Sequence, residues 1–214
     1  MDARTKEAIR YLGYGRHAVD EHTLALVESC FEELSQAACG RIVYRIFDLE
    51  FPENGQILLG SLDIKSRNLT RNLIGCEKAV LLGATLGPKV DLLLRKYSLG
   101  DMARVVTLQA CAAAMLEEYL DEWQDNLGRE MQKEGYYLRP RFSPGYGDFS
   151  IDHQDMILRM LDSAKKIGLS LTDGNMLTPS KSVTALIGLS REKVPCHTKG
   201  CEACQKTDCA YRRA

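Results

Sequence analysis

The sequence lacks any long apolar run and any surplus of positive charge. Its 214 residues carry 28 Lys and Arg against 29 Asp and Glu, so the formal net charge is −1. No basic surplus is available to neutralise the phosphates of a nucleic acid. The apolar stretch "AVLLGATLG" is far shorter than the roughly 20 residues that a membrane-spanning helix needs. We therefore expect neither nucleic acid nor a membrane as a partner.

A secretory signal is also missing from the sequence. The first residues, "MDARTKEAIRYLGYG", have charges scattered through them and no apolar segment of the kind that a signal peptide has. The chain has no internal repeat and no low-complexity tract. Hydrophobic residues make up 45% and charged residues 27%, which is typical of a soluble chain with a substantial core. We expect a cytoplasmic protein.

Eight cysteines are present, and they fall into two groups. Four are scattered, at Cys30, Cys39, Cys76 and Cys111, and are expected to be small buried hydrophobic residues. The other four crowd the last 19 residues with the spacing C-x4-C-x2-C-x4-C, at Cys196, Cys201, Cys204 and Cys209. Four thiolates at this spacing can enclose a zinc ion or hold an iron–sulfur cluster, and the spacing does not distinguish them. Free reduced thiols are the alternative, and His197 is a further candidate ligand.

Hydrophobic spacing predicts helices and strands in irregular order. Helices are expected over residues 3–14, 20–38, 66–77, 88–99, 101–134 and 151–168. Asp20 or Thr23 is a candidate N-cap, as is Asp101, and Gly168 is a helix stop. Strands are expected over 40–51 and 56–64, paired across "PENG", over 78–87, and as two strands around a polar turn within 169–190. Without regular βα alternation, this mixture indicates an α+β fold.

The stretch "LRPRFSPGYGDF", residues 138–149, fits neither a helix nor a strand period. Its prolines fix the backbone and its glycines allow close approach. Arg141 offers a bidentate fork for a carboxylate or phosphate, and Tyr146 offers a flat face and a hydroxyl. These residues suit a rigid ligand-binding wall. The alternative is a Pro- and Gly-rich connection whose Arg pairs with a nearby acid.

An acidic cluster follows a run of alanines in the longest predicted helix. It consists of Glu117, Glu118, Asp121 and Glu122. Glu117 and Asp121 share one helix face at a spacing of four residues. The small residues before them allow a ligand or another element to approach the backbone. The alternative is an ordinary solvated helix face.

Two segments resemble the activation, S-adenosylmethionine-binding domain of cobalamin-dependent methionine synthase. The family signature Arg-x-x-x-Gly-Tyr is similar to the stretch from Arg141 to Tyr146. The Leu-Thr-Glu stretch of the family resembles "LTD" at 171–173, and its Pro before a Ser-Val strand resembles Pro179 before Ser182. The segments "AIRYLGYG" and "GATLGPKVD" look like free-standing members of the family. The resemblance covers most of residues 1–190.

The resemblance implies a fold and a domain organisation. Residues 1–190 would form an α+β domain with a twisted, mainly antiparallel sheet flanked by helices. Residues 191–214 would form a separate Cys-rich tail, which the long enzymes of the family lack.

The resemblance also implies a chemistry. The family binds S-adenosylmethionine over a corrinoid, accepts one electron from a reductase, and transfers the methyl group to cobalt, so that inactive cob(II)alamin becomes methylcobalamin. Arg141 would bind the carboxylate of the ligand, Tyr146 would face the corrinoid, and Glu117 would lie near the cationic groups. Backbone groups of the same loop would hold the adenosyl part, which adds the candidates Ser143, Pro144 and Gly145.

No corrinoid-binding domain is recognisable in the chain, so the resemblance places the cobalamin on a partner. That partner would be a corrinoid protein or a truncated methionine synthase, with flavodoxin or ferredoxin as electron donor. The protein would act as the reactivating component of this methyltransferase, and its Cys tail would pass the electron or dock the partner. The alternative is a non-catalytic adaptor or chaperone of a corrinoid protein with a structural metal in its tail. A Tyr pair follows the last matched strand in the family and has no counterpart after "LIGLS", which favours the alternative, as does the lack of a match for the family's acidic N-terminal residue.

Overall fold

The computed structural model describes residues 1–14, 17–52 and 55–193. The chain forms two compact units, which are considered separately below. The first contains residues 1–40 and 86–121, and the second contains 41–85 and 122–193. Within the described residues, no helix is long and apolar enough to cross a membrane.

The first unit consists of helices. They are α1 (Ala3–Tyr11), α2 (Glu21–Ala37), α4 (Pro88–Tyr97) and the first part of α5 (Met102–Lys133). Asp20 is the N-cap of α2, because its side chain accepts a hydrogen bond of 2.8 Å from the backbone amide of Thr23. Asp101 accepts a bond of 2.9 Å from the amide of Arg104 in the same way. The predicted caps at Asp20 and Asp101 are therefore confirmed.

Helices α2 and α5 of the first unit are joined by polar contacts beside an apolar core. Glu33 forms an ion pair of 2.6 Å with Arg104 and accepts a hydrogen bond of 2.7 Å from the Tyr97 hydroxyl. Cys30 and Cys111 are buried in the core, as expected for small hydrophobic residues. Cys39 is exposed, so the expectation of burial was wrong there. It lies past the end of α2, in the connection to the next strand, where its backbone amide bonds to Leu86.

The second unit is built on a six-stranded sheet with the order β3-β2-β1-β4-β8-β5. Its neighbouring strands all pair antiparallel. The strands are β1 (Arg41–Glu50), β2 (Gln56–Leu59), β3 (Leu62–Lys65), β4 (Cys76–Thr85), β5 (Tyr137–Leu138) and β8 (Ser182–Ser190). A small separate sheet pairs β6 (Ser170–Leu171) with β7 (Leu177–Thr178).

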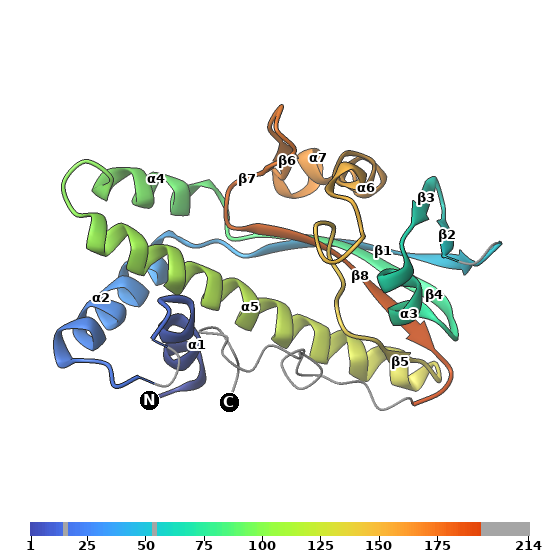
Figure 1. Ribbon diagram of the computed structural model, residues 1–214, viewed down its shortest axis with the longest axis horizontal. Helices are drawn as coiled ribbons and strands as arrows, with labels where there is room; N and C mark the ends of the chain where they lie inside the picture. Colours follow the sequence, from blue (N-terminus) through green and yellow to red (C-terminus); the bar gives the residue numbers. More distant parts are fainter. Residues whose placement is uncertain (15–16, 53–54, 194–214) are drawn as a thin grey trace. The chain divides into compact units, whose positions relative to one another are not determined.

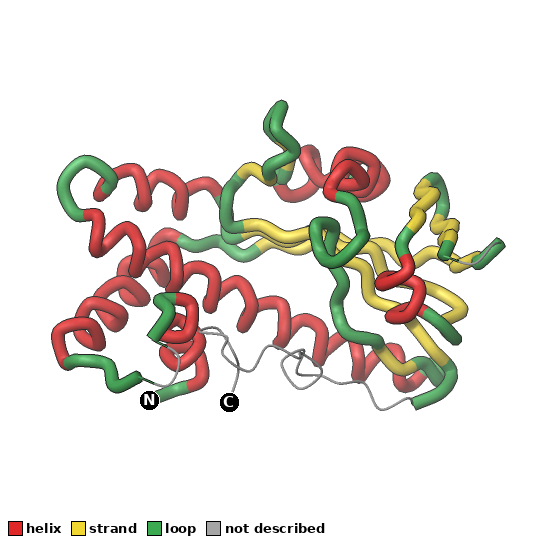
Figure 2. The backbone as a smooth tube through the Cα atoms, in the orientation of Figure 1, coloured by secondary structure: helices red, strands yellow, loops and turns green. Residues whose placement is uncertain are grey.

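Helices cover both faces of this sheet. One face packs Leu81 and Leu186 into a core with α3 (Arg67–Leu73), α6 (Gln154–Leu161) and α7 (Ser163–Ile167). On the other face, Tyr44 lies opposite Leu82, and its ring meets the ring of Trp123 edge-on, with centroids 5.2 Å apart. Trp123 belongs to the second part of α5, which therefore covers that face. Figure 1 shows α6 and α7 on one side of β4 and β8, and Figure 2 shows the loop that leads from β5 to α6.

The predicted α+β class with a mainly antiparallel sheet flanked by helices is confirmed, but three segments differ from expectation. Residues 56–64 form a hairpin of β2 and β3 rather than one strand, because the chain reverses at Gly60 and Ser61. Residues 151–168 form a short turn of 3-10 helix (Ile151–His153), α6 and α7 rather than one helix, because Asp162 takes a left-handed conformation with φ 54°. Residues 169–190 contain three strands rather than two.

Candidate functional site

The predicted ligand-binding loop begins as an extension of the sheet edge. Tyr137 and Leu138 pair with the end of β8, and the amide of Arg139 bonds to the carbonyl of Gly188 at 2.8 Å. Phe142 and Leu186 then exchange two backbone hydrogen bonds of 2.9 Å each. The backbone on both sides of Arg141 is therefore tied to β8, a strand in the interior of the sheet.

Two consecutive turns follow Phe142. The amide of Tyr146 bonds to the carbonyl of Ser143 at 3.2 Å, with Pro144 and Gly145 between them. Pro followed by Gly at φ 91° is the arrangement of a type II turn, because Pro presets its own φ and only Gly accepts the next position without strain. A second turn joins Phe149 to Tyr146 at 3.0 Å, and the amide of Gly145 bonds to the carbonyl of Phe149 at 2.8 Å. Residues 143–149 are thus a closed loop, which we call the 143–149 loop.

Asp148 fastens the 143–149 loop to helix α3. Its carboxylate accepts hydrogen bonds from the Ser66 hydroxyl at 2.6 Å and from the amides of Arg67 and Asn68 at 2.8 and 3.1 Å. These bonds satisfy amides at the start of α3 that have no partner within the helix. They also hold the pKa of Asp148 below its ordinary value, with the bond from Ser66 contributing most. The loop is therefore joined to a segment some 80 residues earlier.

Apolar packing secures the other side of the loop. Phe149 is only 1% exposed and belongs to the core under the sheet. Its ring lies 6.4 Å from that of Phe142 and 5.5 Å from that of His153. Pro144 is buried as well. Hydrogen bonds therefore hold the 143–149 loop to β8 and α3, and its inner side packs on the core through Phe149.

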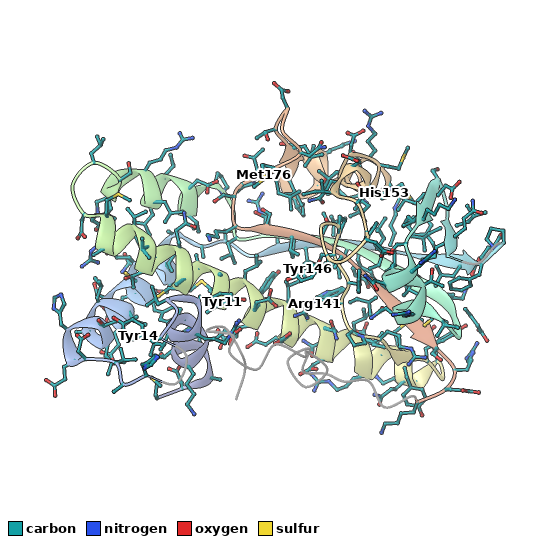
Figure 3. The ribbon with its side chains drawn as sticks, viewed as in Figure 1. Tyr11, Tyr14, Arg141, Tyr146, His153 and Met176 are labelled. Carbon is teal, nitrogen blue, oxygen red and sulfur yellow. The ribbon has the colours of Figure 1, made fainter. Side chains whose placement is uncertain are left out.

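Tyr146 projects from the tip of this anchored loop. Its side chain is 68% exposed, and its ring meets Phe142 edge-on at 6.4 Å. A large aromatic side chain held on a rigid loop and left in solvent suits a contact with a flat ligand or partner. Figure 3 labels Tyr146 on this loop together with Arg141.

Arg141 is half-buried and lies between the sheet edge and helix α5. Its Nη1 donates a hydrogen bond of 3.0 Å to Oε1 of Gln124, a residue of the second part of α5. A guanidinium has five N–H donors in a planar fork, the geometry that a bidentate acceptor such as a carboxylate requires. Gln124 was not predicted from the sequence, because the two residues meet only through the packing of α5 on the sheet.

Comparisons with known proteins concern the fold. No protein-family model and no curated protein matches the sequence. A crystal structure of the MetH reactivation domain bound to AdoHcy is similar to this chain with a TM-score of 0.59 and 13% sequence identity. The match covers 91% of this chain and 79% of that one. The chain has the fold of the MetH reactivation domain.

The two segments that resemble the family lie side by side in this MetH reactivation fold. The first contains the 143–149 loop, and the second builds β6, β7 and β8. Phe142 of the first segment pairs with Leu186 of the second. Ser182, at the start of β8, donates its hydroxyl to the carbonyl of Pro179 at 2.6 Å. The sequence match therefore corresponds to one continuous structural neighbourhood.

Three of the four residues of the acidic cluster on α5 belong to the first unit, and Glu122 belongs to the second. Glu117 is half-buried and belongs to the first unit, as do Glu118 and Asp121. Glu118 is engaged in an ion pair of 3.4 Å with Arg4. The role of Glu117 in the MetH reactivation fold of this chain stays a prediction.

The predicted metal ligands Cys196, Cys201, Cys204 and Cys209, with His197, lie outside the described residues. Among residues 1–14, 17–52 and 55–193, no group of three or more His, Cys, Asp or Glu side chains is placed to hold a metal ion. The zinc or iron–sulfur hypothesis for the tail therefore stays a prediction.

Proposed function

We propose that this protein binds S-adenosylmethionine and uses it to remethylate a corrinoid carried by a partner protein. The observation that carries the proposal is the rigid 143–149 loop beside Arg141, on a fold that holds AdoHcy in the MetH reactivation domain. AdoHcy is what remains of S-adenosylmethionine after its methyl group has been transferred. A site that accepts one accepts the common carboxylate, amino and adenosyl groups of the other.

The proposal assigns a task to Arg141 and to the first four residues of the 143–149 loop. The guanidinium of Arg141 binds the ligand carboxylate through two parallel N–H donors. Backbone groups of Ser143, Pro144 and Gly145 hold the adenosyl part, because the loop is closed and does not need to be ordered by the ligand. Tyr146 lies against the corrinoid, while the task of Glu117 toward the cationic groups of the ligand rests on the resemblance alone. The protein therefore positions two reactants and supplies little acid–base chemistry.

The overall reaction consumes one electron and one methyl cation equivalent. The donor, a flavodoxin or ferredoxin, reduces cob(II)alamin on the partner to cob(I)alamin. The cobalt then displaces AdoHcy from the methyl group, so the bond from sulfur to carbon breaks as the bond from carbon to cobalt forms. The partner is a corrinoid protein or a methionine synthase without an activation domain of its own.

A second candidate function is a non-catalytic adaptor for a corrinoid protein. The observation that favours it concerns the residue after β8, where the family has its Tyr pair. Arg191 here lies over the ring of Tyr136, 3.7 Å from the centroid, and donates to the backbone of Glu134 at 2.7 Å. Arg191 therefore packs on Tyr136 and Glu134 near the end of β8, and no aromatic side chain stands at position 191 to contact a ligand.

An anaerobic methyl-transfer assay tests the proposal. The protein is mixed with a methionine synthase fragment that holds cob(II)alamin, a chemical one-electron reductant, and S-adenosylmethionine labelled in its methyl group. We expect labelled methylcobalamin to form at least ten times faster than without the protein, and the Arg141→Ala variant to lose most of this increase. Formation of a stable complex with the fragment, without transfer of label, would contradict the proposal and favour the adaptor.

A further inference from the structure

Three large apolar side chains are exposed on neighbouring loops of the second unit. They are Tyr146 at 68%, Ile151 at 39% and Met176 at 64%, and we call them the apolar rim. Tyr146 lies on the 143–149 loop, Ile151 opens the 3-10 turn before α6, and Met176 lies in the turn between β6 and β7. Figure 3 labels Tyr146 and Met176 on their two loops. Apolar side chains that gather at a surface mark a contact with another molecule, whereas singly scattered ones do not.

Packing and a hydrogen bond join the loops that carry the apolar rim. A Cβ added at Gly145 of the 143–149 loop would lie 3.9 Å from Cδ1 of Ile151, so Ile151 lies beside this loop. On the other side, Nδ2 of Asn175 donates a hydrogen bond of 3.3 Å to Oδ1 of Asp152. Asn175 precedes Met176 and Asp152 follows Ile151, so this bond fastens the β6–β7 turn to the 3-10 turn. The apolar rim therefore stands on connected supports.

The β6–β7 turn is also held by bonds of its own. The backbone amide of Thr172 donates to the carbonyl of Met176 at 2.9 Å, and its carbonyl accepts from the amide of Asn175 at 3.1 Å. The hydroxyl of Thr172 accepts a bond of 3.3 Å from the amide of Met176. The backbone of Met176 is thus already ordered, and little backbone freedom is lost when another molecule covers its side chain.

Acidic residues accompany the apolar rim on the same segments. Residues 143–156 and 172–176 contain no Lys or Arg, and their four acidic residues are all exposed, at Asp148, Asp152, Asp155 and Asp173. Asp155 forms an ion pair of 3.0 Å with Arg159 on α6. Protein interfaces have a central part enriched in residues such as Tyr and Met within a polar border, and opposite charges across that border favour association. The apolar rim therefore fits a protein whose own apolar patch is bordered by basic side chains.

We propose that the apolar rim docks the protein that carries the corrinoid, and that this partner presents an apolar surface bordered by Lys and Arg beside its corrinoid. A corrinoid held by its own protein offers one face outward, so the protein at the edge of the macrocycle comes close whenever Tyr146 reaches that face. Ile151 and Met176, on the loops next to that of Tyr146, meet this protein surface. A small ligand alone would not require exposed apolar side chains on three loops. The inference rests on the proposed function for the identity of the partner, and it adds Ile151, Met176 and the charge of the surface that they meet.

Titration calorimetry with a methionine synthase fragment that holds cob(II)alamin, at low and at high salt, tests the inference. Met176→Asp and Ile151→Asp each place a charge in the apolar rim, and we expect each to weaken the complex at least about 10-fold. Ile74→Asp is the matched control, because Ile74 is 66% exposed in the turn between α3 and β4 of the same unit. It should bind the fragment within about 2-fold of the wild type. Asp173→Asn should weaken the complex at low salt and make its affinity less dependent on salt.

A second titration, with S-adenosylmethionine, shows whether the variants are folded. We expect all four variants to bind this ligand within about 2-fold of the wild type, because none of the substituted residues has a task toward it. Loss of the fragment with retention of S-adenosylmethionine is the result that the docking surface predicts.

The outcomes separate this inference from the proposed function. Equal affinity of the wild type, Met176→Asp and Ile151→Asp for the fragment overturns the inference alone, even if methyl transfer occurs as proposed. An equal loss in Ile74→Asp also overturns it, as does a wild type that self-associates and becomes monomeric in Met176→Asp, because a second copy would then occupy the apolar rim. If only the rim variants lose the fragment and no methyl group is transferred by the wild type, the proposed function fails and the docking surface stands. A wild type that does not bind the fragment overturns both.

Discussion

Asp148 joins the 143–149 loop to helix α3 through its carboxylate, which accepts these hydrogen bonds best when it is charged. A carboxyl group with a lower pKa in the folded protein than in the unfolded chain stabilises the fold at pH above its unfolded pKa. That stabilisation disappears as the pH falls through the unfolded value, about 3.9 for Asp, toward the folded one. The pKa of Asp148 is lowered, so its contribution follows this pattern.

We therefore predict that Asp148→Asn lowers the free energy of unfolding at neutral pH, because the amide accepts fewer hydrogen bonds and carries no charge. The difference from the wild type should shrink as the pH falls below about 4, where the wild-type carboxylate also becomes protonated. Urea unfolding at several pH values measures this difference. Ser66→Ala should retain part of the pH dependence, since the amides of Arg67 and Asn68 remain as donors. A difference that stays constant into acid would contradict the assignment.

Some residues of the candidate site could be predicted from the sequence, and their partners could not. Arg141 and Tyr146 could be named in advance, because the turn residues around them are local and the resemblance covers them. The partners Asp148 and Ser66 could not be matched, since they are 82 residues apart and neither has a local pattern that names the other. Gln124 looks like any polar residue of an amphipathic helix until α5 is packed on the sheet. Turn residues and their neighbours can be predicted from the sequence, whereas pairs of residues far apart in the sequence can be identified only once the fold is known.

At the scale of elements, the 143–149 loop depends on Gly147, which faces helix α3. Gly147 has φ 56°, and a Cβ at this position would overlap with the side-chain amide of Asn68 in α3. Left-handed backbone costs a residue with a side chain about 1–2 kcal/mol even without an overlap.

We predict that Gly147→Ala lowers the free energy of unfolding by about 2 kcal/mol, through left-handed strain together with the overlap with Asn68. In an Asn68→Ala background the same change should cost only about 1 kcal/mol, since the strain remains, the overlap with the Asn68 amide group is removed, and only the tight contact of 3.3 Å with the Cβ of residue 68 is left. Gly174→Ala is the matched control, because a Cβ there meets nothing within 4 Å, and it should change stability by less than about 0.5 kcal/mol. Equal stability of Gly147→Ala and the wild type, measured by urea unfolding, would show that the loop is not held against α3.

Element prediction succeeded where the hydrophobic period and the end signals agreed. Helix α2 begins after Asp20 and ends near its predicted boundary, and the apolar run in β4 is a strand buried on both faces. The helix expected over 151–168 continues its apolar spacing through Asp162, so the spacing alone cannot reveal that one residue breaks it. Similarly, the apolar pattern of 56–64 does not show that the chain reverses at Gly60.

At the scale of the molecule, the fold is supported by the structure itself, whereas the function is a proposal. The α+β class and the MetH reactivation fold rest on the structure and on its similarity to a solved structure of 13% identity. Binding of S-adenosylmethionine, the corrinoid partner and the metal in the tail are proposals from the site and the resemblance. The second unit contains the hydrogen-bonded 143–149 loop and the exposed Tyr146, and in the proposal a partner supplies the corrinoid that Tyr146 would face.

The central claim is that Arg141 and the 143–149 loop bind S-adenosylmethionine. Titration calorimetry with this ligand on the wild type, Arg141→Ala, Arg141→Lys and the control Arg159→Ala tests it most directly. We predict binding by the wild type and by Arg159→Ala, whose exposed side chain forms an ion pair with Asp155 on α6. Arg141→Ala should bind about 10- to 100-fold more weakly, and Arg141→Lys should be intermediate, because it keeps the charge and loses the fork. Absence of binding in the wild type, or equal affinity of wild type and Arg141→Ala, would contradict the claim.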